Sequence, residues 1–140
     1  ALATTCIDQM QIAAQKNEVT LLQEGGPVTI NGNKTLIEEL LYNLCSNAVR
    51  YNKKGGSVTV ITGMKNQRPA LTVRDTGIGI PKEQQDRVFE RFYRVDKSHS
   101  KEVGGTGLGL SIVRHAAQYH GARLELKSQP GKGTTITVTF

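Results

Sequence analysis

The segment from residue 33 to residue 52 constrains the fold most, because it is long enough for a helix and has two different faces. Apolar side chains recur along it at intervals of four residues, at Leu36, Leu40, Leu44 and Ala48. That spacing predicts one apolar stripe on an α-helix, which must pack against another layer of structure. Asn33 or Thr35 would cap the start of this helix, and the glycines of "KKGG" would end it.

Four later segments have the alternation of β-strands. Ser57–Met64 and Ala70–Asp75 flank "NQRP", which predicts a hairpin, and Arg123–Lys127 and Thr134–Phe140 form a second hairpin around "QPGKG". In the last strand, alternation turns the isoleucine, valine and phenylalanine inward and the threonines outward.

Shorter elements complete the outline. Helices are expected at Leu2–Lys16, Pro81–Arg91 and Leu108–His120, the last ended by Gly121, and short strands at Val19–Leu22 and Val28–Ile30 around the turn "EGGPV". Together these elements predict one α+β domain over residues 1–140. It would be a two-layer α/β sandwich, in which a mixed, mostly antiparallel sheet packs on about three helices.

The composition excludes several classes of protein. The net charge is +6, but acidic residues interleave the basic ones and aromatic residues are only 5%. That pattern favours a polyphosphate ligand and a solvated surface over a nucleic-acid groove. Cys6 and Cys45 fit no metal spacing and make no disulfide framework, which favours a reducing compartment. No stretch approaches the length of a membrane span.

The long helix also carries a polar stripe at spacings of four, four and three residues, formed by Glu39, Asn43, Asn47 and Arg50. Amide oxygens are hard ligands for Mg²⁺, and a guanidinium pairs with phosphate oxygens, so the stripe could be a platform for a metal and phosphates. Taken alone, an ordinary solvated helix face explains these four residues better.

Asp75 is a stronger candidate for a functional residue, because it is in phase with Leu71 and Val73 on the apolar side of its strand. A carboxylate on an inward face is costly unless a partner satisfies it. Gly77 and Gly79 follow in "TGIGIP" and would allow a close backbone approach. A strand end with an Asx turn explains "DTG" equally well, so the residue alone leaves both interpretations open.

The stretch "EVGGTGLGLSIV", residues 102–113, puts four glycines before a helical pattern. A glycine-rich loop that enters a helix can hold an anion, because free backbone N–H groups and the helix dipole point at it. The spacing is neither GxxxxGK[ST] nor GxGxxG, so neither common nucleotide-binding motif is present.

Five motifs in fixed order resemble the catalytic, ATP-binding domain of bacterial sensor histidine kinases, in the GHKL superfamily. They are "NLCSNAVRYN", "DTGIGIP", "FERFYR", "GGTGLGL" and "GKGTT", and the first four are similar to the N, G1, F and G2 boxes of that family. The resemblance covers nearly the whole chain and implies the Bergerat fold, with a flexible ATP lid over about residues 95–105.

The resemblance implies a role for individual residues. Asn47 would be the Mg²⁺ ligand, with Asn43 beside it and Arg50 on phosphate, and Asp75 would accept from the adenine amino group. The remaining nucleotide contacts it implies are Tyr51, Gly77, Gly79, Ile80, Arg94, Gly105, Thr106, Gly107, Leu108, Gly109, Leu110 and Thr134. The cofactors it implies are ATP and Mg²⁺.

Asn43 separates kinases from hydrolases in this superfamily. Hydrolysing relatives of the gyrase and heat-shock-chaperone type carry a Glu there, which activates water, and an amide cannot take that proton at neutral pH. The resemblance therefore implies ATP held for a histidine on a separate dimerisation domain. None of His99, His115 and His120 has the context of such an acceptor, and the last two are expected to be ordinary surface residues.

The expected whole is a sensor kinase of a two-component system, of which this chain would be a fragment. Its partners would be its own dimerisation domain and a response regulator, with no nucleic acid. The fragment should be monomeric and the full-length protein a homodimer, and the domain would lie on the cytoplasmic side of a membrane. The alternatives are an anti-sigma-type serine kinase, another GHKL ATP-binding domain, or a degenerate interaction module.

Overall fold

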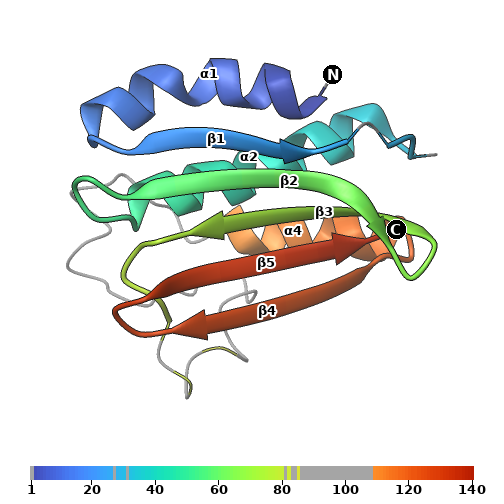
Figure 1. Cartoon of the computed structure of the whole chain (residues 1–140). Coiled ribbons are helices and arrows are strands. Elements are labelled where there is room, and N and C mark those ends of the chain that lie inside the picture. Colours follow the sequence, from blue (N-terminus) through green and yellow to red (C-terminus); the bar gives the residue numbers. More distant parts are fainter. Residues whose placement is uncertain (1, 27, 31, 81, 83–84, 86–108) are drawn as a thin grey trace.

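The computed structural model describes residues 2–26, 28–30, 32–80, 82, 85 and 109–140. The elements in chain order are α1 (Leu2–Lys16), β1 (Thr20–Gly25), α2 (Lys34–Arg50), β2 (Ser57–Lys65), β3 (Arg68–Asp75), α4 (Gly109–Tyr119), β4 (Arg123–Gln129) and β5 (Gly133–Thr139). The helices lie on one side of a twisted sheet (Figure 1). The predicted two-layer α+β sandwich is therefore confirmed.

The five strands form one mixed sheet in the order β1-β2-β3-β5-β4. β1 pairs with β2 in parallel, and the other three pairs are antiparallel. Both predicted hairpins are present, β2 with β3 and β4 with β5. Because β3 is the central strand, a side chain at its end has a neighbouring strand on each side.

The core lies between the sheet and the helices. The two valines predicted to share a face of β2, Val58 and Val60, are completely buried, and so is Leu40 of the α2 stripe. Fully burying an aliphatic side chain of this size stabilises the fold by about 1.5–3 kcal/mol. α2 packs against α1, α4 and the central strands, so it is the element on which both layers depend.

Asn33 caps the start of α2, since its side-chain oxygen accepts from the Leu36 N–H. The backbone N–H of Asn33 in turn donates to Nε2 of His120, at 2.9 Å, while Nδ1 of His120 contacts the Ala116 carbonyl oxygen at 2.7 Å. The prediction that His120 is an ordinary surface residue is wrong. Its imidazole ties the end of α4 to the start of α2.

Three predictions of local structure need correction. Val28–Ile30 is not a strand: the contacts of Gly26 with Thr62 end the β1–β2 ladder, and the chain then turns towards α2 with no strand partner. β1 runs on to Gly25, so it takes up the first residues of the predicted turn. α2 is ended at Tyr51, whose φ is −99°, and not by a glycine.

The helix predicted over Pro81–Arg91 lies almost wholly outside the described residues, and so do the F box and the ATP lid predicted over residues 95–105. The helix predicted over Leu108–His120 is confirmed from Gly109 to Tyr119. In the part of the chain that the structure describes, no helix has the length and apolar character needed to cross a membrane.

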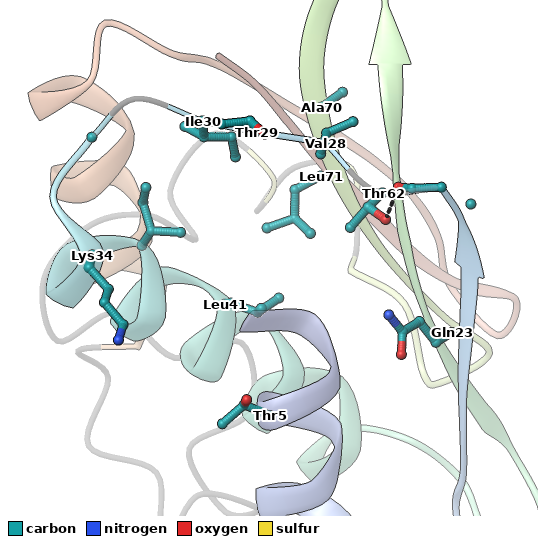
Figure 2. Close-up of a pocket in the computed structure, with 14 residues that line it drawn as sticks. Thr5, Gln23, Val28, Thr29, Ile30, Lys34, Leu41, Thr62, Ala70 and Leu71 are labelled. Atoms are coloured by element: carbon teal, nitrogen blue, oxygen red, sulfur yellow. Dashed lines mark hydrogen bonds between the residues drawn. The ribbon is translucent and has the colours of Figure 1, made fainter. Parts of the chain in front are cut away.

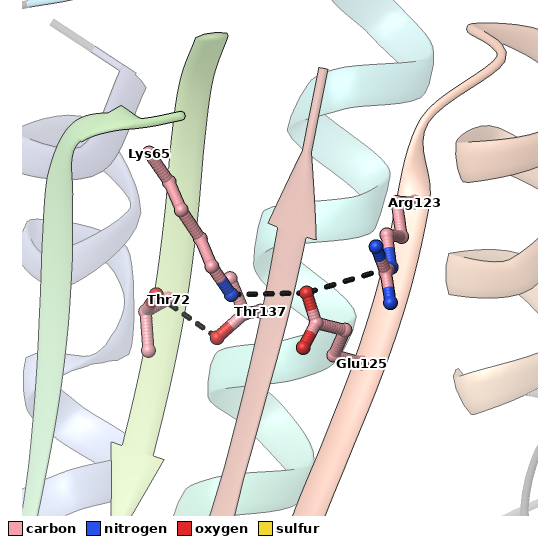
Figure 3. Close-up of polar contacts among 5 residues, drawn as sticks. All are labelled: Lys65, Thr72, Arg123, Glu125 and Thr137. Atoms are coloured by element: carbon pink, nitrogen blue, oxygen red, sulfur yellow. Dashed lines mark hydrogen bonds and ion pairs between the residues drawn. The ribbon is translucent and has the colours of Figure 1, made fainter. Parts of the chain in front are cut away.

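The sheet face away from the helices is polar. Figure 3 shows three contacts there: the Thr72 and Thr137 hydroxyls lie 3.2 Å apart, and Glu125 lies 2.9 Å from Lys65 and 3.7 Å from Arg123. The ion pair with Lys65 is the main reason why the pKa of Glu125 falls below its ordinary value. Most threonines of β5 face this side as predicted, but Thr134 does not, because it lies in phase with the buried Ile136 and Val138.

Candidate nucleotide-binding site

Asp75 ends β3 and faces the helix side of the sheet. It pairs in register with Val58 of β2 and with Thr134 of β5. Its Oδ1 accepts two backbone hydrogen bonds, from the Gly77 N–H at 2.8 Å and from the Thr134 N–H at 3.2 Å. Among the described residues no donor reaches Oδ2, so the second oxygen is held in place and is available to a ligand.

Burial raises the pKa of Asp75 from 3.8 to about 6, although the hydrogen bonds from Gly77 and Thr134 act in the opposite direction. No cation contacts the carboxylate within the described residues. A carboxylate that folding desolvates without a charged partner gains from a donor supplied by a ligand. This favours a binding role for Asp75 over the Asx turn alone, although the turn contact to Gly77 is also present.

The loop after Asp75 passes too close to its neighbours for side chains. A Cβ on Gly77 would lie 2.4 Å from the Tyr51 carbonyl oxygen. A Cβ on Gly79, where φ is +74°, would lie 2.1 Å from the carbonyl oxygen of Gln129. The glycines of "DTGIGIP" are therefore needed because the loop is sandwiched between the end of α2 and the β4–β5 hairpin.

Two polar residues hold this loop from either side. On the hairpin side, the Ser128 hydroxyl accepts from the Ile80 N–H at 2.7 Å and lies 2.8 Å from the Thr134 hydroxyl. On the α2 side, the Asn52 Oδ1 accepts from the Thr76 hydroxyl at 3.4 Å, and its Nδ2 donates to the Ser57 carbonyl oxygen of β2. The Ile78 N–H donates to the Tyr51 carbonyl oxygen at 3.1 Å, which joins the end of α2 directly to the loop.

The polar stripe on α2 is half-buried at Asn43, Asn47 and Arg50 and exposed at Glu39. Nδ2 of Asn43 donates to the Glu39 carbonyl oxygen at 2.7 Å, so its amide oxygen remains as an acceptor. The half-buried part of the stripe offers two amide oxygens and a guanidinium, and its one carboxylate, Glu39, is exposed. Such a set suits a metal ion that arrives with phosphates and keeps its waters better than a free cation. The stripe therefore fits Mg²⁺ bound to a polyphosphate, with Asn47 and Asn43 to hold it.

Residues 32–140 match the family model described as histidine kinase-, DNA gyrase B- and HSP90-like ATPase. This chain belongs to that family. The matched residues include α2, Asp75 and its loop, and the closing hairpin, which are the elements that build the site.

Relatives within this ATPase family are sensor kinases. The chain is 38% identical over 138 residues to the sensor histidine kinase YkoH of Bacillus subtilis, covering 99% of this chain and 30% of YkoH. It is 40% identical over 139 residues to the phosphate regulon sensor protein PhoR of Pseudomonas aeruginosa, covering 99% and 31%. The chain thus spans about a third of the relatives that it matches. The prediction of a sensor-kinase catalytic domain is confirmed.

Solved structures give the same result for the fold. The mycobacterial sensor histidine kinase MprB is 27% identical, with a TM-score of 0.80 and coverage of 98% of this chain and 92% of that one. The catalytic domain of the histidine kinase ThkA, at 21% identity, has a TM-score of 0.83 over 99% and 89%. Because ThkA is less than 25% identical to this chain, its similarity supports the Bergerat fold and nothing further.

Of the residues that the resemblance implies for this ATPase domain, the structure brings one group together. Tyr51, Asp75, Gly77, Gly79, Ile80 and Thr134 meet where α2, β3 and the β4–β5 hairpin converge. Asn43, Asn47 and Arg50 lie on α2, which ends at the same point. Leu110 is in the first turn of α4 and packs partly buried against the core, and Gly109 begins that helix. Arg94 and Gly105–Leu108 lie outside the described residues.

Ser128 and Asn52 were missed as site residues. Ser128 is in phase with Leu124 and Leu126, so it is a polar residue on the apolar side of β4. That is the signal which singled out Asp75. The predicted strand ended one residue earlier, at Lys127, and therefore hid it. Asn52 has no comparable signal, because a polar residue after a helix end is ordinary.

A cavity of about 800 Å³ lies elsewhere, on the helix side of the sheet. Figure 2 shows that Leu41 of α2, Leu71 of β3 and the segment around Val28 and Ile30 surround it. Leu71 lies four residues before Asp75 along β3, towards the opposite end of the strand. This cavity is therefore separate from the residues that hold Asp75.

Proposed function

We propose that this domain binds ATP with Mg²⁺ and supplies the γ-phosphoryl group to a histidine on a separate dimerisation domain in two-component signalling. The observation that carries the proposal is Asp75: a half-buried carboxylate whose Oδ1 is fixed by two backbone N–H groups and whose Oδ2 meets no donor among the described residues. The adenine amino group is a donor of the kind that such an oxygen lacks. Family membership supports the nucleotide, and the named sensor kinases support the acceptor.

The phosphate side of the proposal rests on α2. Asn47 and Asn43 would hold Mg²⁺, which supplies charge neutralisation at the phosphates, and Arg50 would contact a phosphate oxygen. Asn43 would help to orient the Mg²⁺ and cannot accept a proton from water, so bound ATP should remain intact until an acceptor histidine arrives. The solved full-length histidine kinase ShkA is in complex with AMPPNP, a nucleotide ligand that is consistent with this role.

The isolated chain should bind Mg²⁺–ATP without phosphorylating itself. The full-length protein would be a homodimer, with this domain on the cytoplasmic side of the membrane and a response regulator as its downstream partner. The domain alone would be monomeric. An anti-sigma-type serine kinase remains the alternative within the same fold, and its product would be an acid-stable phosphoserine.

Calorimetry with and without EDTA, followed by phosphorylation in trans, tests the proposal. ATP should bind only with Mg²⁺. A dimerisation domain carrying its acceptor histidine should then gain an acid-labile label, slowly, because tethering no longer raises the effective concentration. Binding that EDTA leaves unchanged, steady ATP hydrolysis by the pure chain, or an acid-stable label would contradict the proposal.

A further inference from the structure

We propose that the cavity between the start of α2 and the segment after β1 binds a small carboxylate with an apolar body, of the class of medium-chain fatty acids. The cavity has a volume of about 800 Å³, which lies in the range of small-molecule sites, about 300–1,000 Å³. The inference goes beyond the proposed function, because the cavity lies towards the end of β3 that is opposite Asp75.

The walls of the cavity are mainly aliphatic (Figure 2). Ile37 and Leu41 of α2 and Leu71 of β3 line it from the core, and these three side chains are between 2% and 6% exposed. Val28 and Ile30 line it from the segment after β1 and are half-buried. An apolar chain that enters the cavity is therefore removed from water on several sides, which favours its binding.

Residues 28–30 border the cavity without being part of the sheet. Just before them, the Gly26 N–H donates to the Thr62 carbonyl oxygen at 3.1 Å, and the Thr62 hydroxyl donates to the Gly26 carbonyl oxygen at 2.8 Å. After them, Asn33 caps α2. Among the described residues, no backbone hydrogen bond reaches residues 28–30 themselves. A ligand can therefore enter beside this segment without breaking a strand pair or a helix.

The charges around the cavity favour an anion. Among the described residues that line it, Lys34 carries the only charge, and there is no aspartate or glutamate. Lys34 is also the first residue of α2, whose first turn contains no acidic residue, so the positive end of the helix dipole adds to its charge. Its ion pair with Glu38 is 3.9 Å long and exposed. Such a pair contributes little, so the ammonium group can turn to a ligand.

A ligand that matches both features has one anionic end at Lys34 and an apolar body between Leu41 and Leu71. A polyphosphate does not match, because several negative charges would meet one ammonium group and aliphatic walls. A monocarboxylate with an alkyl or aromatic body matches, because its single charge stays at Lys34, which is exposed to water. The cavity should therefore select its ligand by apolar shape and by one charge.

Titrations of the isotope-labelled chain with octanoate and with octanol, followed through the methyl resonances of isoleucine and leucine, test the proposal. Both compounds should shift the resonances of Ile37, Leu41 and Leu71, because both bring an apolar chain to the cavity. Octanoate should bind about three- to tenfold more tightly than octanol, which is the gain expected from one exposed cation and a helix N-terminus.

Lys34→Gln should remove this preference and leave the affinity for octanol unchanged. Lys54→Gln is the matched control, because the Lys54 side chain is 81% exposed, against 80% for Lys34, and also pairs with a glutamate. Lys54 does not line the cavity, so its variant should keep the preference of wild type. Val28→Trp, which fills the cavity from outside the helices and strands, should weaken both compounds by at least about tenfold.

Equal affinities of wild type for octanoate and octanol would overturn the choice of ligand. A preference that survives in Lys34→Gln, or that Lys54→Gln also removes, would overturn it too. Methyl resonances of Ile37, Leu41 and Leu71 that neither compound shifts would overturn the site itself, and so would unchanged binding in folded Val28→Trp. Lys34 is on the surface, so its variant keeps the test valid should the tryptophan variant not fold, and the methyl spectrum reports folding directly.

Discussion

The two ends of β3 make a useful comparison. At the carboxyl end, Asp75 sits among groups that are each engaged: the Gly77 and Thr134 N–H groups on its Oδ1, and the Ser128 hydroxyl beyond them. At the amino end, Leu71 lines an open cavity of about 800 Å³. The polar end is held by hydrogen bonds and close backbone contacts, whereas the cavity end is lined by residues of α1, β1, α2, β2 and β3 and of the segment after β1.

Under the proposed function, this difference predicts that the end with fixed polar groups, and not the end with the larger volume, binds the nucleotide. A ligand is recognised by groups whose directions are fixed before it arrives, because binding then pays little to order them. At the Asp75 end, glycines allow backbone to touch backbone, and each contact fixes a donor or acceptor. The following predictions test whether the two ends differ in this way.

The largest effect should come from Gly79→Ala. A Cβ there would lie 2.1 Å from the Gln129 carbonyl oxygen at a φ of +74°, so the loop and hairpin must separate. We expect the free energy of unfolding to fall by about 3 kcal/mol, and ATP affinity to fall with it. Urea unfolding and calorimetry measure the two.

Gly121→Ala is the matched control, because Gly121 has a φ of +63° and no heavy atom within 4 Å of an added Cβ. It lies next to His120, far along the chain from the site loop. The conformational strain alone should cost about 1 kcal/mol and leave ATP binding unchanged. Equal effects of the two substitutions would show that the tight contact at Gly79 has no special role.

Asp75→Asn should raise the free energy of unfolding and weaken the binding of ATP. The folded pKa of about 6 exceeds the ordinary 3.8, so Asp75 contributes stability below pH 3.8 that is lost as the pH rises through 6. At pH 7.5 the charged carboxylate destabilises the folded state, because folding partly desolvates it. A neutral amide removes this charge, so the free energy of unfolding should rise by about 1–2 kcal/mol in the variant.

In wild type, ATP should be preferred over GTP by at least about tenfold, because guanine offers an acceptor to an acceptor-only carboxylate. The preference should narrow in Asp75→Asn, since an amide can turn a donor or an acceptor to the base. Urea unfolding at pH 7.5 and competition titrations measure both effects. A variant no more stable than wild type, with ATP binding unchanged, would mean that Asp75 does not read the base.

A somewhat smaller effect is expected from pH. Protonation of Asp75 removes the acceptor, so ATP affinity should fall by up to about tenfold between pH 7 and pH 5. Phosphate groups of ATP titrate near pH 6 as well, and Asp75→Asn isolates their contribution. The same pH dependence in both proteins would assign the whole effect to the nucleotide.

The smallest effect is expected at the cavity, for a side chain of β1, the strand that β2 separates from β3. Gln23 lines the cavity with an exposed side chain. Gln23→Ala should change the free energy of unfolding by less than about 0.5 kcal/mol and ATP affinity by less than about twofold. A larger loss of ATP affinity would show that the cavity and the Asp75 end of β3 are coupled, which would contradict the difference between them described above.

Periodic segments were predictable from the sequence, and unpaired ones were not. α1, α2 and α4 and the two hairpins follow from repeats of three to four or of two residues, because burial of one face fixes them. Val28–Ile30 has the composition of a strand, but a strand needs a partner to pair with. Both edges of β2 are already occupied, by β1 and β3, and no local sequence signal shows this.

The site divides in the same way. Asp75 was found because a charge on an apolar face stands out within its own strand. Ser128 and His120 act through contacts with Ile80 and Asn33, 48 and 87 residues away along the chain. Such pairings are set by how the hairpin and α4 pack, which the local pattern around each residue does not contain.

Cys6 of α1 and Cys45 of α2 are both buried in the core, as free thiols that contact each other. The hydrogen bond with Cys6, together with burial, raises the pKa of the Cys45 thiol, and the same hydrogen bond lowers the pKa of the Cys6 thiol. Both side chains are buried, so it is burial that keeps reagents from the pair. Thiol reagents will therefore meet it only after the two helices part. The rate at which a thiol reagent labels the pair therefore measures how often the α1–α2 interface opens, and no cysteine has to be introduced for the measurement.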